Sequence, residues 1–141
     1  MVRELHRAGV TRTTSADLRE NAAATRNIVV AGADPAADAE RILSLTGDDR
    51  YDVVVCAAGG WAGSSARDRS IFADTALMWN LNVQSALVAA HVAWRPLRPN
   101  GLLVLTGAGA ALRPCPGMLS YGISKVATHH IVQSVAAEVC C

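Results

Sequence analysis

The sequence predicts an α/β fold, a doubly wound parallel sheet that is incomplete at both ends. Segments typical of strands and helices alternate along the chain. Two apolar runs, "VVVC" and "LLVL", are continuous, as in parallel strands that are buried on both faces. Glycine-rich turns follow both runs, where such sheets bind ligands. The 141 residues have the size of one domain, so we expect one partial domain over residues 1–141.

The first part of the chain is expected to hold two helices and two short strands. "VRELHRAG" is typical of the last turns of a helix, with Gly9 as its stop. The β-branched "VTRTTSADL" and the apolar "NIVVAG" predict strands. Asp34 is expected to cap the next helix, with Pro35 in its first position and Gly47 as its stop.

The second part is expected to hold two buried strands and two longer helices. "YDVVVCAAGG" predicts a strand that starts at Tyr51, and a long helix follows from about Asp74 to Trp94, closed by Pro96. "GLLVLTGAG" predicts the other strand. The last helix lies in "PGMLSYGISKVATHHIVQSVAAE".

Composition excludes several classes of protein. With 51% hydrophobic and 18% charged residues, the chain can bury a core, unlike a disordered tail. The net charge of +1 and the lack of a basic run give no reason to expect nucleic acid. No apolar stretch reaches the roughly 18 residues of a membrane span, and no secretory signal is recognisable. We therefore expect a soluble, cytoplasmic protein without membrane contact.

The cysteines and histidines form no metal-binding pattern. Cys56 ends a run of valines and is interpreted as a small buried hydrophobe. Cys115, Cys140 and Cys141 form no C-x-x-C pair with it or with each other. We expect four reduced thiols and no bound metal.

Tyr121 and Lys125 stand four residues apart in the last helix and so lie on one face. A phenol has a pKa of about 10 and needs a drop of roughly three units to exchange a proton near neutral pH. An ammonium about 4 Å away, at an effective dielectric constant of about 20, supplies that much. The pair predicts a general acid. The alternative is a surface tyrosine beside a solvated lysine, because such pairs are common by chance.

Together with "DVVVCAAGGWAG", "GLLVLTGAGAAL" and "PGMLSYGISK", the pair resembles the short-chain dehydrogenase/reductase family, which has a Rossmann-like fold. The resemblance is strong from about Tyr51 to Glu138 and weaker from Val2 to Gly47. "GGWAG" is its specific part and is similar to the dihydropterin-reducing members, since the wider family has Asn-Asn-Ala-Gly in place of "CAAG". The resemblance implies NADH-dependent reduction of quinonoid dihydropterin to tetrahydropterin.

The same resemblance implies catalytic roles for three residues. Tyr121 would donate the proton, and Lys125 would lower its pKa and hold the nicotinamide ribose. Asn82 matches an asparagine that relays protons, with Asn80 as a near competitor and an ordinary helix-interior asparagine as the alternative. Ala108 stands thirteen residues before Tyr121, where the wider family has a catalytic serine. The dihydropterin-reducing members also do without that serine.

The resemblance further implies a site for the adenosine half of the cofactor. Asp17 matches the acidic residue that binds the adenosine ribose, and a carboxylate there repels a 2′-phosphate and favours NADH. Arg19 nearby leaves NADPH open. Asp34 matches a residue near the adenine, although its capping role explains it equally well.

The turn after the strand from Tyr51 would form the other half of the cofactor site. Ala58, Gly59 and Gly60 match positions where the backbone approaches the cofactor, and Tyr121 would contact both cofactor and substrate. Trp61 matches a tryptophan that lies against the pterin ring, because a flat indole stacks on a flat heterocycle. The alternative for Trp61 is a core tryptophan beneath a loop.

Two other functions stay open at this point. One is a short-chain reductase of another carbonyl or imine, which Ala108 and "GGWAG" disfavour. The other is a non-catalytic truncated subunit or dimerisation module. The family commonly forms a homodimer through the long helix and the Tyr–Lys helix. The residues spaced four apart on the latter are Ile123, Ala127, Ile131 and Val135.

The resemblance also implies that the chain is an internal piece of a reductase. The chain starts inside the helix that follows the family's glycine-rich phosphate loop, and it stops at the Tyr–Lys helix. We therefore expect the 141-residue chain to bind NADH poorly and to lack activity by itself.

Overall fold

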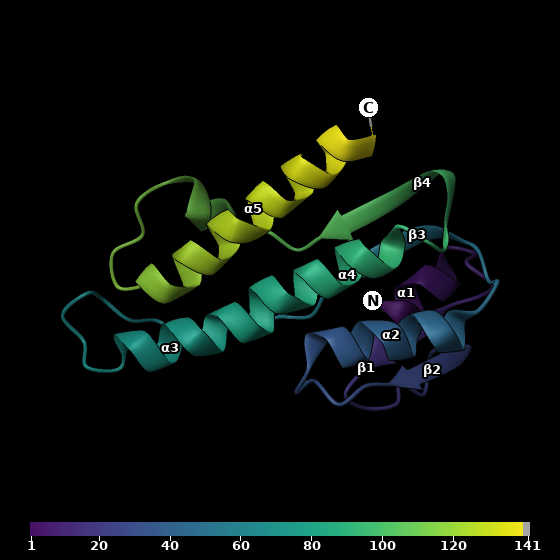
Figure 1. The fold of residues 1–141 in the computed structure, drawn as a ribbon, viewed down its shortest axis with the longest axis horizontal. Coiled ribbons are helices and arrows are strands. Elements are labelled where there is room, and N and C mark those ends of the chain that lie inside the picture. Colours follow the sequence, from purple (N-terminus) through teal and green to yellow (C-terminus); the bar gives the residue numbers. More distant parts are fainter. Residues whose placement is uncertain (140–141) are drawn as a thin grey trace. The chain divides into compact units, whose positions relative to one another are not determined.

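A computed structural model describes residues 1–139, which form two compact units, residues 1–48 and the residues from Asp49 onward (Figure 1). Each unit has its own parallel two-stranded sheet. Cys140 and Cys141, predicted to be free thiols, lie outside the described residues. Among the described residues no helix is long and apolar enough to cross a membrane.

The first unit contains α1 (Val2–Arg7), β1 (Thr14–Asp17), β2 (Arg26–Val29) and α2 (Pro35–Thr46). The two strands run parallel, with Thr14 opposite Arg26 and Asp17 opposite Val29. Ile28 of β2 is buried. All four elements were predicted from the sequence, and β2 is shorter than the apolar run suggested.

Two carboxylates secure the start of α2. The predicted cap is confirmed, because Asp34 Oδ1 accepts hydrogen bonds from the amides of Ala36, at 2.9 Å, and Ala37, at 3.4 Å. Asp38, only 8% exposed, lies one turn later and was not singled out from the sequence. Its two oxygens accept from the amides of Ala31, at 3.0 Å, and Gly32, at 2.8 Å. Asp38 therefore holds the turn between β2 and α2 onto the helix.

The second unit contains the elements that carry the predicted catalytic pair. In chain order they are β3 (Tyr51–Cys56), α3 (Ile71–Met78), the π-helical η1 (Trp79–Gln84), α4 (Ser85–Ala93), β4 (Leu97–Leu105), the 3-10 helix η2 (Gly109–Leu112) and α5 (Leu119–Val139). The segments α3, η1 and α4 form one continuous helix that runs beside α5 (Figure 1). This helix was predicted, but it begins at Ile71 rather than near Asp74 and contains an unpredicted π-helical turn.

The sheet of the second unit pairs β3 with β4 in parallel, from Val53 opposite Leu102 to Cys56 opposite Leu105. Cys56 is buried, as predicted. The prediction that both strands are buried on both faces is wrong for this chain. Helix α4 packs against both strands, whereas the side chains of Val53, Leu102 and Val104 are exposed. A continuous apolar run shows that each residue favours burial. It does not show whether another layer of the structure covers the strand.

Removal of Asp38 should destabilise α2 more than removal of Asp34. Asp34→Ala should lower the local free energy of unfolding by about 1 kcal/mol, as loss of a cap does. Asp38→Ala removes two part-buried hydrogen bonds to a buried carboxylate and should cost about 2 kcal/mol. Native-state hydrogen exchange of the α2 amides measures both. Glu40→Ala, on the exposed face of α2, is the matched control. An equal or smaller effect of Asp38→Ala would refute the anchoring role.

Candidate active site

The first turn of α5 is fixed by a cluster of three hydroxyls. Ser120 is fully buried, and its Oγ lies 2.7 Å from Ser64 Oγ and 2.9 Å from Thr75 Oγ1. The amide of Leu119 also donates to the carbonyl of Ser64, at 2.8 Å. These bonds tie the start of α5 to the segment after β3 and to α3. They set the position of Tyr121, the next residue.

Lys125 is buried, with 4% of its surface exposed. Its Nζ donates to the carbonyl of Thr106 at 2.7 Å and lies 5.8 Å from the centroid of the Tyr121 ring. Burial lowers the pKa of Lys125 from its ordinary value, and the nearby Cys56 opposes this shift. The alternative of a solvated lysine beside a surface tyrosine therefore does not describe this pair.

Lys125 is also the single lysine of the 141 residues, in which the other basic side chains are arginines and histidines. Arginine is a rigid planar fork, whereas lysine carries a compact ammonium with three hydrogen-bond donors on a flexible stem. Arginine thus supplies the exposed positive side chains of this chain, and its single lysine is at a buried position. This feature of composition is visible in the sequence and supports a specific requirement for an ammonium at residue 125.

Asn82 lies in the π-helical turn and is 2% exposed. Its Nδ2 donates to Ser124 Oγ at 2.9 Å and to the carbonyl of Gly60 at 3.2 Å, and its Oδ1 accepts from the amide of Gly60 at 2.9 Å. Asn82 therefore links the long helix to α5 and to the turn after β3. Asn80, the competitor from the sequence, is exposed. Only Asn82 lies where it can act together with Lys125.

The turn after β3 passes very close to these side chains. Gly59 has φ +151°, and a Cβ added there would lie 2.6 Å from Asn82 Oδ1 and 3.7 Å from Lys125 Nζ. A Cβ on Gly60 would lie 2.8 Å from Leu81 Cδ1. Glycine is therefore required for the backbone to reach this place. The structure brings together Tyr121, Lys125 and Asn82 with this turn.

The other predicted residues lie around this centre or in the first unit. Ala58 is exposed in the same turn, and Trp61 is 65% exposed, so the alternative of a core tryptophan does not hold. Asp17 is exposed at the end of β1, where its Oδ1 accepts from the amide of Leu18 at 2.7 Å. Asp17 and Asp34 belong to the first unit and are described only within it.

Several site residues were not found from the sequence. Ser120 and Ser124 place hydroxyls beside Tyr121 and Lys125, and Ser124 Oγ also donates to the carbonyl of Tyr121 at 2.7 Å. Thr106 supplies the carbonyl that Lys125 binds. The available signal was the pair of serines four residues apart on an otherwise apolar helix.

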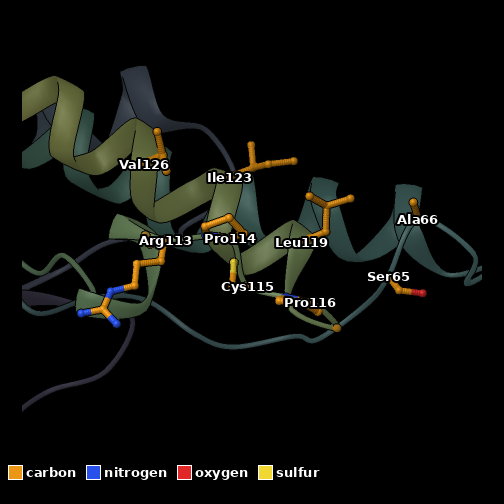
Figure 2. Close-up of a pocket in the computed structure, with 12 residues that line it drawn as sticks. Ser65, Ala66, Arg113, Pro114, Cys115, Pro116, Leu119, Ile123 and Val126 are labelled. Carbon is orange, nitrogen blue, oxygen red and sulfur yellow. The ribbon is translucent and has the colours of Figure 1, made fainter.

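One hollow of the second unit is separate from this centre. It measures about 570 Å³, and none of the predicted site residues lines it. Figure 2 shows Ile123 and Val126 projecting from α5 at this hollow, beside Pro114 and Cys115 of the preceding segment. Within residues 1–139, no group of three or more His, Cys, Asp or Glu side chains is arranged to hold a metal ion.

Comparison with known proteins finds a curated relative with a name. No protein-family model matches it. It is similar to a protein of Dictyostelium discoideum named dihydropteridine reductase, with 37% identity over 127 residues. The aligned part covers 89% of this chain and 55% of that protein. The chain thus spans about half the length of this curated relative.

Solved structures of short-chain dehydrogenases share the fold. One, from Francisella tularensis subsp. tularensis SCHU S4, has a TM-score of 0.79 and 19% identity, covering 92% of this chain and 53% of its own. Another, from Burkholderia cenocepacia J2315 in complex with NADP, has a TM-score of 0.67 and 30% identity, covering 81% of this chain and 47% of its own. These likenesses confirm the predicted α/β fold class.

Lys125→Met should not destabilise the second unit, although Lys125 is buried. Removing a buried cation removes its desolvation cost, so the free energy of unfolding should stay unchanged or rise by about 1 kcal/mol. Urea unfolding followed by tryptophan fluorescence measures this, because Trp61, Trp79 and Trp94 all lie in the second unit. Arg67→Met removes an exposed cation and is the matched control. A loss above about 2 kcal/mol would mean that the ammonium is needed for folding itself.

Proposed function

We propose that this chain, which has the fold of the short-chain dehydrogenases and is similar to a dihydropteridine reductase over 89% of its length, is part of an NADH-dependent reductase of quinonoid dihydropterin. The observation that carries the proposal is the buried ammonium of Lys125, 5.8 Å from the ring centroid of Tyr121. Burying a cation is costly unless it is paired and hydrogen-bonded. A structural role alone gives no reason for that cost.

In the proposed reaction, the quinonoid ring gains one hydride and one proton. The nicotinamide cofactor supplies the hydride when it is bound. Tyr121 gives the proton, or polarises the ring nitrogen by a hydrogen bond from its hydroxyl. The positive charge of Lys125 stabilises the negative charge that develops on the tyrosine oxygen, and its effect is strong because the surroundings are poor in water.

Lys125 has a second task in this proposal. An ammonium can donate three hydrogen bonds, and one is made to the Thr106 carbonyl at 2.7 Å. The ribose of the nicotinamide offers hydroxyl acceptors for the others. The bond to Thr106 orients the ammonium, so that its charge stays near Tyr121.

Asn82 orients the parts of the site in this proposal. Both ends of its amide are bonded to Gly60, and Nδ2 also reaches Ser124. Asn82 thereby keeps the turn with Ala58 and Gly59 close to Lys125, where that turn would contact the cofactor. A proton relay through Asn82 remains part of the proposal.

Trp61 and Asp17 supply recognition in this proposal. The exposed indole of Trp61 can stack on the pterin ring, a contact that adds to the burial of apolar area. The exposed carboxylate of Asp17 favours the two ribose hydroxyls of NADH over a 2′-phosphate. NADPH is the alternative cofactor, because the Burkholderia structure contains NADP and Arg19 lies near Asp17. Asp34, which caps α2, is proposed to lie near the adenine of the cofactor as well.

A homodimer through the long helix and α5 is also proposed. Phe72 on α3 and Ile123 and Val126 on α5 are exposed apolar side chains. They offer apolar area to a second copy, as dimer interfaces do. The other residues of the predicted stripe, Ala127, Ile131 and Val135, are half-buried. A dimerisation module without activity therefore stays a second candidate, and the turnover test below separates it from the reductase.

Tyr121→Phe should lower turnover by about 10²-fold or more, as loss of a positioned acid does. The test uses a chimera in which this chain replaces the 127 matching residues of the Dictyostelium relative. NADH oxidation with quinonoid dihydropterin is followed by absorbance, and NADH affinity by calorimetry. NADH affinity should change little, because only the phenol oxygen is lost.

The unmodified chimera and the Dictyostelium relative are the positive controls for this test. Tyr51→Phe removes the other tyrosine hydroxyl of the chain and should leave turnover unchanged. An active chimera in which Tyr121→Phe has normal turnover would remove Tyr121 from its role. Turnover with other carbonyls or imines but not with the pterin would favour the wider family's chemistry.

Asp17→Ala in the same chimera should weaken NADH more than NADPH. The ribose loses a carboxylate acceptor, whereas a 2′-phosphate loses a repulsion, so the ratio of the two dissociation constants should shift by roughly tenfold toward NADPH. Titration with each cofactor measures the ratio. Glu20→Ala removes a neighbouring exposed carboxylate and serves as the control. Equal weakening of both cofactors would make Asp17 an ordinary strand-end residue.

A further inference from the structure

His129 continues the row of functional side chains on α5. Tyr121, Lys125 and His129 are spaced four residues apart, so they follow one another along one face of the helix. Lys125 Nζ donates to the carbonyl of Thr106 at 2.7 Å. His129 Nε2 accepts from the amide of Ala108 at 3.2 Å. Two successive side chains of this row therefore hold the short segment 106–108 that follows β4.

The two ends of this segment are held differently. Thr106 is tied to β3, because its amide and its Oγ1 both donate to the carbonyl of Cys56, at 3.2 Å and 2.7 Å. The amide of Ala108 is held by His129. Between them lies Gly107, which gives the backbone wide conformational freedom. A Cβ on Gly107 would overlap His129 Nε2, so the imidazole lies directly against the glycine.

We propose that His129 is a positioning residue of the proposed reductase site: its Nε2 holds the amide of Ala108 and thereby keeps the Thr106 carbonyl directed at Lys125. This inference rests on the proposed function. Without the imidazole, the peptide units around Gly107 can rotate, and the carbonyl that orients the ammonium loses its fixed direction. Ala108 has no side-chain polar group to hold the segment in place of His129.

The contact also fixes the chemical form of the histidine. A nitrogen that accepts a hydrogen bond from an amide carries no proton, so His129 must be neutral with its proton on Nδ1. This tautomer has a distinct nitrogen NMR signature. It can be observed in the chain itself, without cofactor or substrate.

The structural test is NMR of the isotope-labelled 141-residue chain. We expect His129 to carry its proton on Nδ1, and the Ala108 amide to be protected from exchange. His129→Leu should speed exchange at Ala108 at least tenfold while Thr106 stays protected. Because Lys125 is the single lysine, selective labelling gives one side-chain signal, which should also shift. His129→Gln presents an oxygen at a similar reach and should preserve both signals.

His130→Leu is the matched control for these variants. His130 is the next residue on α5, is exposed, and has its Nε2 3.5 Å from Ser134 Oγ. Its replacement should leave the Ala108 amide and the Lys125 signal unchanged. A proton on His129 Nε2, or unchanged exchange at Ala108 in His129→Leu, would overturn the proposal. Survival of the Gln variant keeps the test decisive even where the Leu variant folds poorly.

The functional test uses the chimera described above. His129→Leu should lower kcat roughly tenfold with little change in the KM for the pterin, and His129→Gln should restore kcat to within about threefold. Lost protection of Ala108 with normal kcat would overturn the positioning role alone. A chimera without reductase activity would overturn the proposed function and, with it, the role of His129 in turnover, whatever the NMR result.

Discussion

The candidate site depends on one constraint, the burial of a single ammonium ion. A lysine taken out of water loses its hydration free energy. Fixed polar partners in the protein must compensate for part of that loss. Here the main partner is the carbonyl of Thr106. The amide and the hydroxyl of Thr106 are bonded in turn to the end of β3, and the proposal above assigns the direction of its carbonyl to His129. Gly59 and Tyr121, one turn earlier on α5, both lie close to this ion.

Polar side chains around the ion join separate elements of the second unit. Asn82 joins the turn after β3 to α5, and Ser120 joins α5 to α3. In the described residues, no buried side-chain nitrogen or oxygen lacks a hydrogen-bond partner. A fully satisfied network of this kind specifies one arrangement, because any displacement leaves a polar group without its partner. The polar network thereby favours one arrangement of the site.

Local signals in the sequence predicted most of the elements and part of the site. The cap at Asp34, the stop at Gly47 and the Tyr–Lys spacing are short-range rules, and each is present in the structure. Burial of the strands was overestimated, because no local signal tells whether a layer covers Val53 or Leu102. Asp38, Thr106 and His129 were missed for the same reason: each of their bonds involves a backbone group whose position depends on the fold.

The π-helical turn at Trp79–Gln84 helps one long helix to keep a buried row at a spacing of four residues. Met78, Asn82, Ala86 and Ala90 are buried and spaced by four. In a regular α-helix each such step advances by about 40° beyond a full turn, and the row would drift around the axis. A wider turn with i to i+5 bonds takes up part of that drift. Deleting one residue there would rotate α3 against α4 by about 100° and carry Met78 away from the row. An insertion or deletion in this turn would therefore change which residues of the helix are buried, whereas most substitutions would change only one side chain.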